Sequence, residues 1–292
     1  MNAHVLVPYD GSEPSGWAVS YVKERLSDER ITLLHVVEPF ADHGEAAGLA
    51  GRRSERVYDE ATQLLAEATA DFEEYAGGVE TELVYGRPEQ VIPRYVETND
   101  VDEVVIGAHG QDGAARLLLG GVAETVLRRA PVPVTVVRPV HGVDRFDSPE
   151  HVLVPFDGSV CSRSALEYAF DRFPTAAVAA LYVHYPPIET FDVLETESDL
   201  IDAVGRIDEE HDSEGARMLS GAKRTADEYG RPLQTAVESG DPARVILSWI
   251  DDHDVDHVVM GCHGRTGLRR LVLGSVAETV ARRAPVPVTA VP

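Results

Sequence analysis

Short apolar runs alternate with stretches of helical periodicity along this chain. The first half holds five runs that predict β-strands, at His4–Pro8, Ile31–Val37, Val79–Tyr85, Asp102–Ile106 and Val132–Val137. Between these runs, apolar residues recur at helical spacing, as at Ala18, Tyr21, Val22 and Leu26. Strands that alternate with helices are typical of parallel sheets. The pattern therefore predicts an α/β fold in which helices cover both faces of a five-stranded parallel sheet.

The second half of the chain repeats the first. The segment His151–Ser159 matches His4–Ser12 at eight of nine positions, and Arg270–Val291 matches Arg116–Val137 at 18 of 22. We therefore predict two tandem domains, residues 1–140 and 150–292, joined by the segment 138–150. The offset between the copies grows from 147 to 154. The extra length is placed in the acidic segment 187–214, which is expected to be a solvated helix and loop, with a lid or a partner surface as the alternative.

A glycine-rich segment follows the fourth strand of the second half. Its glycines and serine are Gly261, Gly264, Gly274 and Ser275, and its arginines are Arg265, Arg269 and Arg270. A strand end that leads through glycines into a helix lets backbone N–H groups approach an anion, which also faces the positive end of the helix. The arginines add positive charge in an otherwise acidic chain. The segment therefore predicts a site for an anionic ligand.

The spacing of this segment resembles the nucleotide-binding signature of the universal stress protein family, Gly-x2-Gly-x9-Gly followed by Ser or Thr, and the resemblance extends over both halves. It implies the adenine nucleotide alpha hydrolase-like, Rossmann-like fold. It also implies a stress-response protein that binds ATP, ADP or AMP, with or without magnesium, between the ends of strands one and four. The residues implied for this site are Pro155, Phe156, Asp157, Val183, Gly261, His263, Gly264, Arg265, Gly274, Ser275 and Val276.

The first half departs from the signature at one position. Gly121 stands where the second half has Ser275, and the loop before it has Arg116 in place of three arginines. Because the loss of one hydrogen bond to a charged group weakens binding about tenfold or more, we expect a weaker site in this half. Its residues are Pro8, Tyr9, Asp10, Gly107, Gly110, Gly120, Gly121 and Val122.

Some of these residues also fit plain structural roles. Ser275 begins a Ser-x-x-Glu pattern, so its hydroxyl suits a helix capping box as well as a phosphate contact. The Asp-Gly-Ser sequences at residues 10–12 and 157–159 suit turns that lead into helix caps. His109 and His263 are expected to brace their loops rather than act as acid or base, because neither has an evident partner carboxylate.

No catalytic residue is assigned. The chain lacks the P-loop, dinucleotide and hydrolase-nucleophile motifs, so a regulatory ligand is favoured over turnover. The alternatives are a slow ATPase or phosphotransferase that uses Asp157 or His263, and a nucleotide-free interaction module. No metal site is expected, because the pair His253 and His257 spans a turn rather than one helix face. Cys262 is interpreted as an ordinary small residue.

The charge of the chain is unusual. It has 50 Asp and Glu against 26 Lys and Arg, a formal net charge of -24, and its lysines are Lys23 and Lys223 alone. Such a surface repels nucleic acid and anionic membranes, so neither is expected as a partner. An acidic, lysine-poor chain resembles the proteins of salt-loving organisms, in which salt screens self-repulsion. The chain lacks an apolar run of ~18 residues, a secretory start and a cysteine framework, which favours a cytoplasmic protein.

The closing strands of both halves are apolar at almost every position. Residues 132–137 and 286–291 would leave open edges unless they were paired. The family resemblance implies that the two halves pair through these strands as a pseudo-dimer within one chain. Further homo-oligomers and protein partners are left open.

Overall fold

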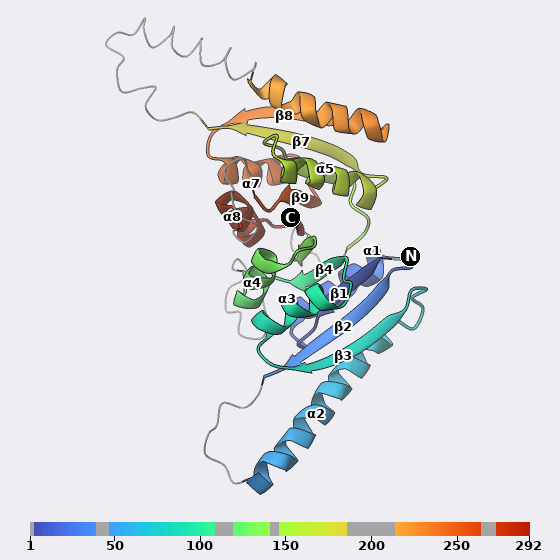
Figure 1. The fold of residues 1–292 in the computed structure, drawn as a ribbon. Coiled ribbons are helices and arrows are strands. Elements are labelled where there is room, and N and C mark those ends of the chain that lie inside the picture. The colour runs from blue at the N-terminus through green and yellow to red at the C-terminus, as the bar shows by residue number, and fades with distance from the viewer. Residues whose placement is uncertain (1–2, 39–46, 109–118, 141–145, 186–213, 264–272) are drawn as a thin grey trace, which may run out of the picture. The chain divides into compact units, whose positions relative to one another are not determined.

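The computed structural model describes residues 3–38, 47–108, 119–140, 146–185, 214–263 and 273–292 (Figure 1). The chain divides into two compact units, and the main boundary lies between Ser148 and Pro149. Within the described ranges, no helix is both long and apolar enough to cross a bilayer.

Unit 1 is built on a five-stranded parallel sheet with the strand order β3-β2-β1-β4-β5. Its strands are β1 His4–Pro8, β2 Arg30–Val37, β3 Val79–Tyr85, β4 Glu103–Gly107 and β5 Val134–Val137. Its helices are α1 Glu13–Arg25, α2 Ala47–Ala70, α3 Pro88–Thr98 and α4 Gly121–Arg129. The strands match the sequence prediction to within two residues at each end. The largest difference is at β5, which begins two residues late, after Pro133, because proline has no N–H for the ladder.

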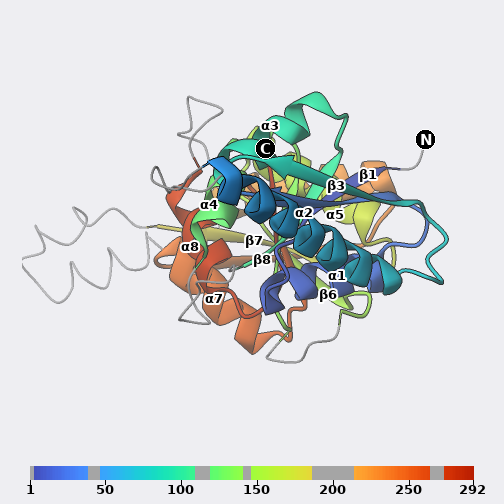
Figure 2. The same ribbon diagram turned by 90° about the horizontal axis from the view of Figure 1, so that it is seen from below.

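The helices of unit 1 form two layers. Helices α1 and α2 pack on one face of the sheet, and α3 and α4 pack on the other (Figures 1 and 2). The central strand β1 is buried along its whole length, because both faces are covered and it has a neighbouring strand on each side. The apolar residues predicted for the α1 stripe, including Tyr21 and Val22, belong to one core cluster with Leu65 and Phe72 of the α2 region.

The segment after β5 contributes to the core of unit 1. Phe146 is fully buried, and its ring packs edge-on against Tyr21 with ring centroids 5.8 Å apart. Its backbone N–H donates to Glu24 Oε2 over 2.7 Å, and its carbonyl accepts from Arg25 Nε over 3.2 Å. The joining segment is therefore anchored on α1 for part of its length.

Unit 2 repeats this architecture with the strand order β10-β9-β6-β7-β8, again in parallel. Its strands are β6 His151–Pro155, β7 Ala177–His184, β8 Gln234–Ser239, β9 His257–Gly261 and β10 Val288–Val291. Its helices are α5 Val160–Arg172, a helix over residues 214–229, α7 Pro242–Asp252 and α8 Ser275–Arg283. The fold class is thus the predicted one, with two tandem α/β domains. The proposed insert lies mostly outside the described residues.

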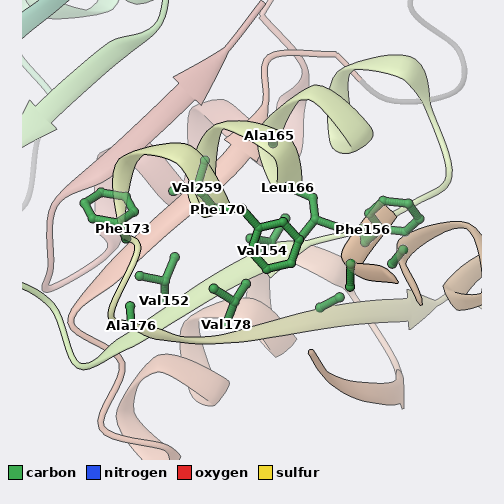
Figure 3. Packing of buried hydrophobic residues seen from close by; sticks show 14 of the residues in the cluster. Val152, Val154, Phe156, Ala165, Leu166, Phe170, Phe173, Ala176, Val178 and Val259 are labelled. Carbon is green, nitrogen blue, oxygen red and sulfur yellow. The ribbon is translucent and has the colours of Figure 1, made fainter. Parts of the chain in front are cut away.

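The two helix layers of unit 2 have a consequence for ligand binding. Helix α5, which follows β6, packs on one face together with the helix 214–229, whereas α7 and α8 pack on the other. Figure 3 shows the first of these cores, in which Leu166 and Phe170 of α5 lie over Val152 and Val154 of β6. The helices that follow the adjacent strands β6 and β9 therefore leave on opposite faces. That arrangement opens a crevice at the carboxyl ends of these strands.

Candidate functional site

A cavity of about 480 Å³ lies in unit 2, where the carboxyl ends of β6, β7 and β9 meet the start of α8. Its volume is within the usual range for small-molecule sites. It brings together nine of the residues predicted for the second half: Pro155, Phe156, Asp157, Val183, Gly261, His263, Gly274, Ser275 and Val276. Gly264 and Arg265, also predicted, lie outside the described residues.

Ser275 occupies the first helical position of α8. The N-cap is Gly274, whose backbone is extended and whose carbonyl accepts the first helical bond, from Glu278 N over 2.9 Å. The capping-box interpretation of Ser275 is therefore wrong, because the box requires serine at the N-cap. Glu278 instead forms an ion pair with Arg282 one turn later, at 2.8 Å. Within the described residues, the Ser275 hydroxyl makes no hydrogen bond, and the side chain lies at the cavity.

The backbone at the start of α8 offers donors to the cavity. Gly274 N donates to Cys262 O over 2.8 Å, so this amide is already engaged. The next three amides, those of Ser275, Val276 and Ala277, have no backbone partner among the described residues. All three residues line the cavity. Unpaired amides at a helix start, together with the helix dipole, favour a negatively charged group at this end.

Gly261 has a packing role as well as a place in the cavity wall. A Cβ at this position would lie 2.7 Å from Cys161 Cβ at the start of α5. Gly107, the equivalent residue of unit 1, would place a Cβ only 2.2 Å from Pro14 O. These glycines therefore let the first turn of the helix approach the end of the fourth strand, which brings the two sides of the crevice together.

The turn after β6 forms the middle of the cavity wall. Asp157 Oδ1 accepts from Ser159 N over 3.0 Å, and Ser159 is the N-cap of α5 and accepts from Ser162 N over 3.1 Å. The predicted role of this Asp-Gly-Ser sequence as a turn into a helix cap is thus confirmed. Phe156 lines the cavity but is almost completely buried, and its ring belongs to the core shown in Figure 3.

Three polar residues at the β7 end were missed by sequence reasoning. His184 and Tyr185 follow Val183 at the end of β7, and Glu214 is the first described residue of the helix over residues 214–229. His184 Nδ1 lies 3.2 Å from Glu214 Oε2, and the two side chains are 15% and 29% exposed. The signal available in the sequence was a histidine and a tyrosine at the end of an apolar strand. The partner Glu214 lies 30 residues further on and could not be paired with His184 by spacing.

Cys262 and His263 lie at the end of β9. Burial raises the pKa of the Cys262 thiol to about 12, and the nearby Cys161 adds to the shift. The thiol is therefore protonated at neutral pH, in agreement with its interpretation as a small core residue. His263 Nε2 is buried and has no hydrogen-bond partner among the described residues. A buried imidazole nitrogen without a partner favours a ligand group or water at this point.

His253 and His257 belong to different elements. His257 is a buried residue of β9, and its Nε2 lies 2.8 Å from Thr289 Oγ1. His253 follows α7, and its ring stacks on Trp249 with centroids 3.7 Å apart. In the described part of the chain, no three His, Cys, Asp or Glu side chains are grouped as metal ligands.

The equivalent turn of unit 1 has a different electrostatic character. Burial raises the pKa of Tyr9, and the carboxylates of Asp71, Asp10 and Glu67 raise it further. Helix α4 begins at Gly121, so it presents no hydroxyl at the position of Ser275. The other predicted residues of this site also occupy matching places: Pro8 ends β1, Gly107 ends β4, Gly120 is the N-cap of α4 and Val122 lies in its first turn. Gly110 and His109 lie outside the described residues.

Comparisons with known proteins agree with this architecture. A family model described as "Universal stress protein family" matches residues 1–138 and 149–292. Universal stress protein Rv2005c of Mycobacterium tuberculosis is 33% identical over 238 residues, which cover 79% of this chain and 76% of that protein. A universal stress protein of Mycolicibacterium smegmatis is 30% identical over 303 residues, which cover 98% of this chain and 96% of that protein. The crystal structure of a universal stress protein from Archaeoglobus fulgidus shares the fold, with a TM-score of 0.62 and 24% identity, over 99% of this chain and 95% of that one.

Proposed function

This chain belongs to the universal stress protein family, and on that premise we propose that unit 2 binds ATP or a related adenine nucleotide as a regulatory ligand. The observation that carries the proposal is the start of α8. Three amides that have no backbone partner in the described part of the chain, together with the Ser275 hydroxyl, lie there at one end of a cavity of nucleotide size. These groups are the usual partners of phosphate oxygens at a helix start.

The polarity of the cavity orients the ligand. Its α8 end carries N–H and O–H donors, whereas Asp157 and Glu214 place carboxylates on the β6 and β7 side. Phosphate is attracted to the first end and repelled from the second. The nucleotide therefore binds with its phosphates at α8 and its base at the end of β7, near Val183. Magnesium can accompany the phosphates, held chiefly by the nucleotide itself.

We propose that unit 1 binds the nucleotide more weakly. Its helix start lacks the hydroxyl, and in addition to Asp10, the counterpart of Asp157, the carboxylates of Glu67 and Asp71 act on Tyr9 near the equivalent turn. Both differences disfavour an anion. The domains proposed to carry the two sites are residues 1–140 and 150–292.

Turnover is not part of the proposed function. Asp157, the carboxylate of the cavity wall in the turn after β6, already accepts a hydrogen bond from the backbone of its own turn. The Cys262 thiol is protonated. A phosphate-release assay on protein with excess ATP tests this point. Release that exceeds the uncatalysed rate and disappears in the His263→Gln variant would favour the slow ATPase instead.

We further propose that the protein is cytoplasmic and belongs to a high-salt proteome. This proposal rests on the net charge of -24 and on the presence of only two lysines in the sequence. The pairing of the two closing strands within one chain stays a prediction from the sequence, and crosslinking of cysteines introduced into them would test it.

The binding proposal is tested by titration calorimetry on the full chain at high salt. We expect one tight ATP site per chain and one weaker or undetectable site. Two equal sites, or no heat of binding at any ATP concentration below a millimolar, would contradict the proposal.

A further inference from the structure

We propose that the pair Glu214 and His184 selects the base in unit 2, by accepting a hydrogen bond from the exocyclic amino group of adenine. The inference rests on the proposed nucleotide binding and names the residues that would set its base preference. Glu214 is the residue that touches the base, and His184 is a positioning residue.

Glu214 and His184 both belong to the cavity wall, at the end of β7. The strand order β10-β9-β6-β7-β8 puts the end of β7 two strands away from β9, and α8 starts on the chain segment between β9 and β10. The amides of α8 and the Glu214 carboxylate therefore lie at opposite sides of the same cavity. A nucleotide that places its phosphates at α8 brings its base toward Glu214.

Glu214 is held in place by His184 and by the packing of the residue that follows it. His184 Nδ1 lies 3.2 Å from Glu214 Oε2, and both side chains are largely buried. The next residue, Gly215, packs so tightly on β8 that a Cβ there would lie 2.6 Å from Val237 Cγ2. The described part of the helix thus packs closely on the sheet at Gly215, next to Glu214, and the contact with His184 holds the carboxylate at the cavity.

The hydrogen-bonding chemistry of the Glu214 carboxylate determines which base it favours. An ionised carboxylate only accepts hydrogen bonds, and its two oxygens can accept from His184 and from a ligand at the same time. Adenine presents an amino group at its sixth position, which donates. Hypoxanthine and guanine present a carbonyl there, and its oxygen would face the carboxylate with like partial charge. The site therefore favours the amino purine over the oxo purine.

The experiment compares ATP with ITP, which replaces the amino group by an oxo group, in calorimetric titrations of the full chain. We expect ATP to bind the wild-type protein about tenfold more tightly than ITP or better, as for one hydrogen bond to a charged group. In Glu214→Gln the side-chain amide can donate to the oxo group, so the ratio should approach one.

Glu238→Gln is the matched control. Glu238 is an exposed carboxylate on β8, paired in register with Val183, and it is not part of the cavity wall. This variant loses the same charge and should keep the wild-type ratio. Because the ratio compares two ligands on one preparation, partial unfolding of a variant does not change it.

Three results would overturn the inference. Equal binding of ATP and ITP by the wild-type protein would remove the base preference but leave nucleotide binding intact. An unchanged ratio in Glu214→Gln would assign the preference to other residues. Failure of both nucleotides to bind would overturn the inference together with the function on which it rests.

Discussion

Gly274, the N-cap of α8, donates from its backbone N–H to Cys262 O, just after β9, over 2.8 Å. The unit 1 counterparts, Gly120 and Ala108, form the same bond at 2.7 Å. In both units the residue after this glycine therefore occupies the equivalent position, beside the end of the fourth strand. That residue is Ser275 in unit 2 and Gly121 in unit 1, so the two sites differ by a hydroxyl at an otherwise equivalent position.

Ser275→Ala should weaken ATP binding about tenfold while leaving the unfolding temperature nearly unchanged. The hydroxyl is lost as a phosphate donor, but it caps no helix and makes no hydrogen bond within the described residues. Titration calorimetry measures the affinity, and Ser248→Ala, an exposed serine of α7, is the control. An unchanged ATP affinity in Ser275→Ala would show that the Ser275 hydroxyl does not bind the nucleotide.

Gly121→Ser should strengthen nucleotide binding in unit 1. A Cβ at this position meets no atom of the described residues within 4 Å, so the new side chain fits without strain against them. In a Ser275→Ala background, which weakens the unit 2 site, the gain should appear as tighter binding at the unit 1 site. The unit 1 affinity should stay below that of wild-type unit 2, because Glu67 and Asp71 remain near Tyr9. A unit 1 affinity that reaches that of wild-type unit 2 would show that these carboxylates have no influence.

Gly261→Ala should destabilise the fold by about 1 to 3 kcal/mol, because the added methyl group meets the backbone of Cys161 at 2.8 Å. Gly121→Ala provides the contrast, since it adds a methyl group in open space within a helix and should stabilise by about 0.5 to 1 kcal/mol. Chemical denaturation measures both changes. Equal effects of the two substitutions would mean that the close approach of α5 to β9 is relaxed in solution.

Arg231→Ala should cost about 1.5 to 3 kcal/mol of unfolding free energy. The Arg231 guanidinium donates to the carbonyls of Phe170, Phe173 and Ala176 at 3.1 to 3.2 Å and lies over the Phe170 ring. The variant leaves these carbonyls at the end of α5 without their donor. Lysine should rescue only part of the loss, because it cannot span three acceptors with a planar fork. Urea denaturation of both variants checks the prediction, and full rescue by lysine would contradict it.

The Cys262 thiol should resist alkylation in the folded protein. Its pKa is raised from 9.0 to about 12 by burial. The fold therefore gains stability from the neutral thiol below about pH 9 and loses that gain as the pH rises toward 12. In the Cys161→Ser variant, iodoacetamide at pH 8 should leave Cys262 unmodified until urea is added. Equal rates of modification with and without urea would contradict the burial of this thiol.

Much of the fold and part of the site follow from local sequence pattern. The strands were predictable because each is contiguous and most are bounded by glycine or proline, and the ends of the glycine segment, Gly261 and Gly274, lie at the cavity as expected. The sequence left capping and a phosphate contact both open for Ser275, because a Ser-x-x-Glu pattern does not say which residue takes the extended conformation, and here Gly274 does. His184 and Glu214 were missed because the register of β7 and the packing of Gly215 on β8 bring them together over 30 residues.

The most direct test of the account is a crystal structure of the protein grown with excess ATP. The account predicts a nucleotide in the unit 2 cavity, with phosphate oxygens within hydrogen-bond distance of the Ser275 hydroxyl and of the Val276 amide. An empty unit 2 cavity in such crystals, or a nucleotide whose phosphates lie at Glu214 instead of α8, would contradict it.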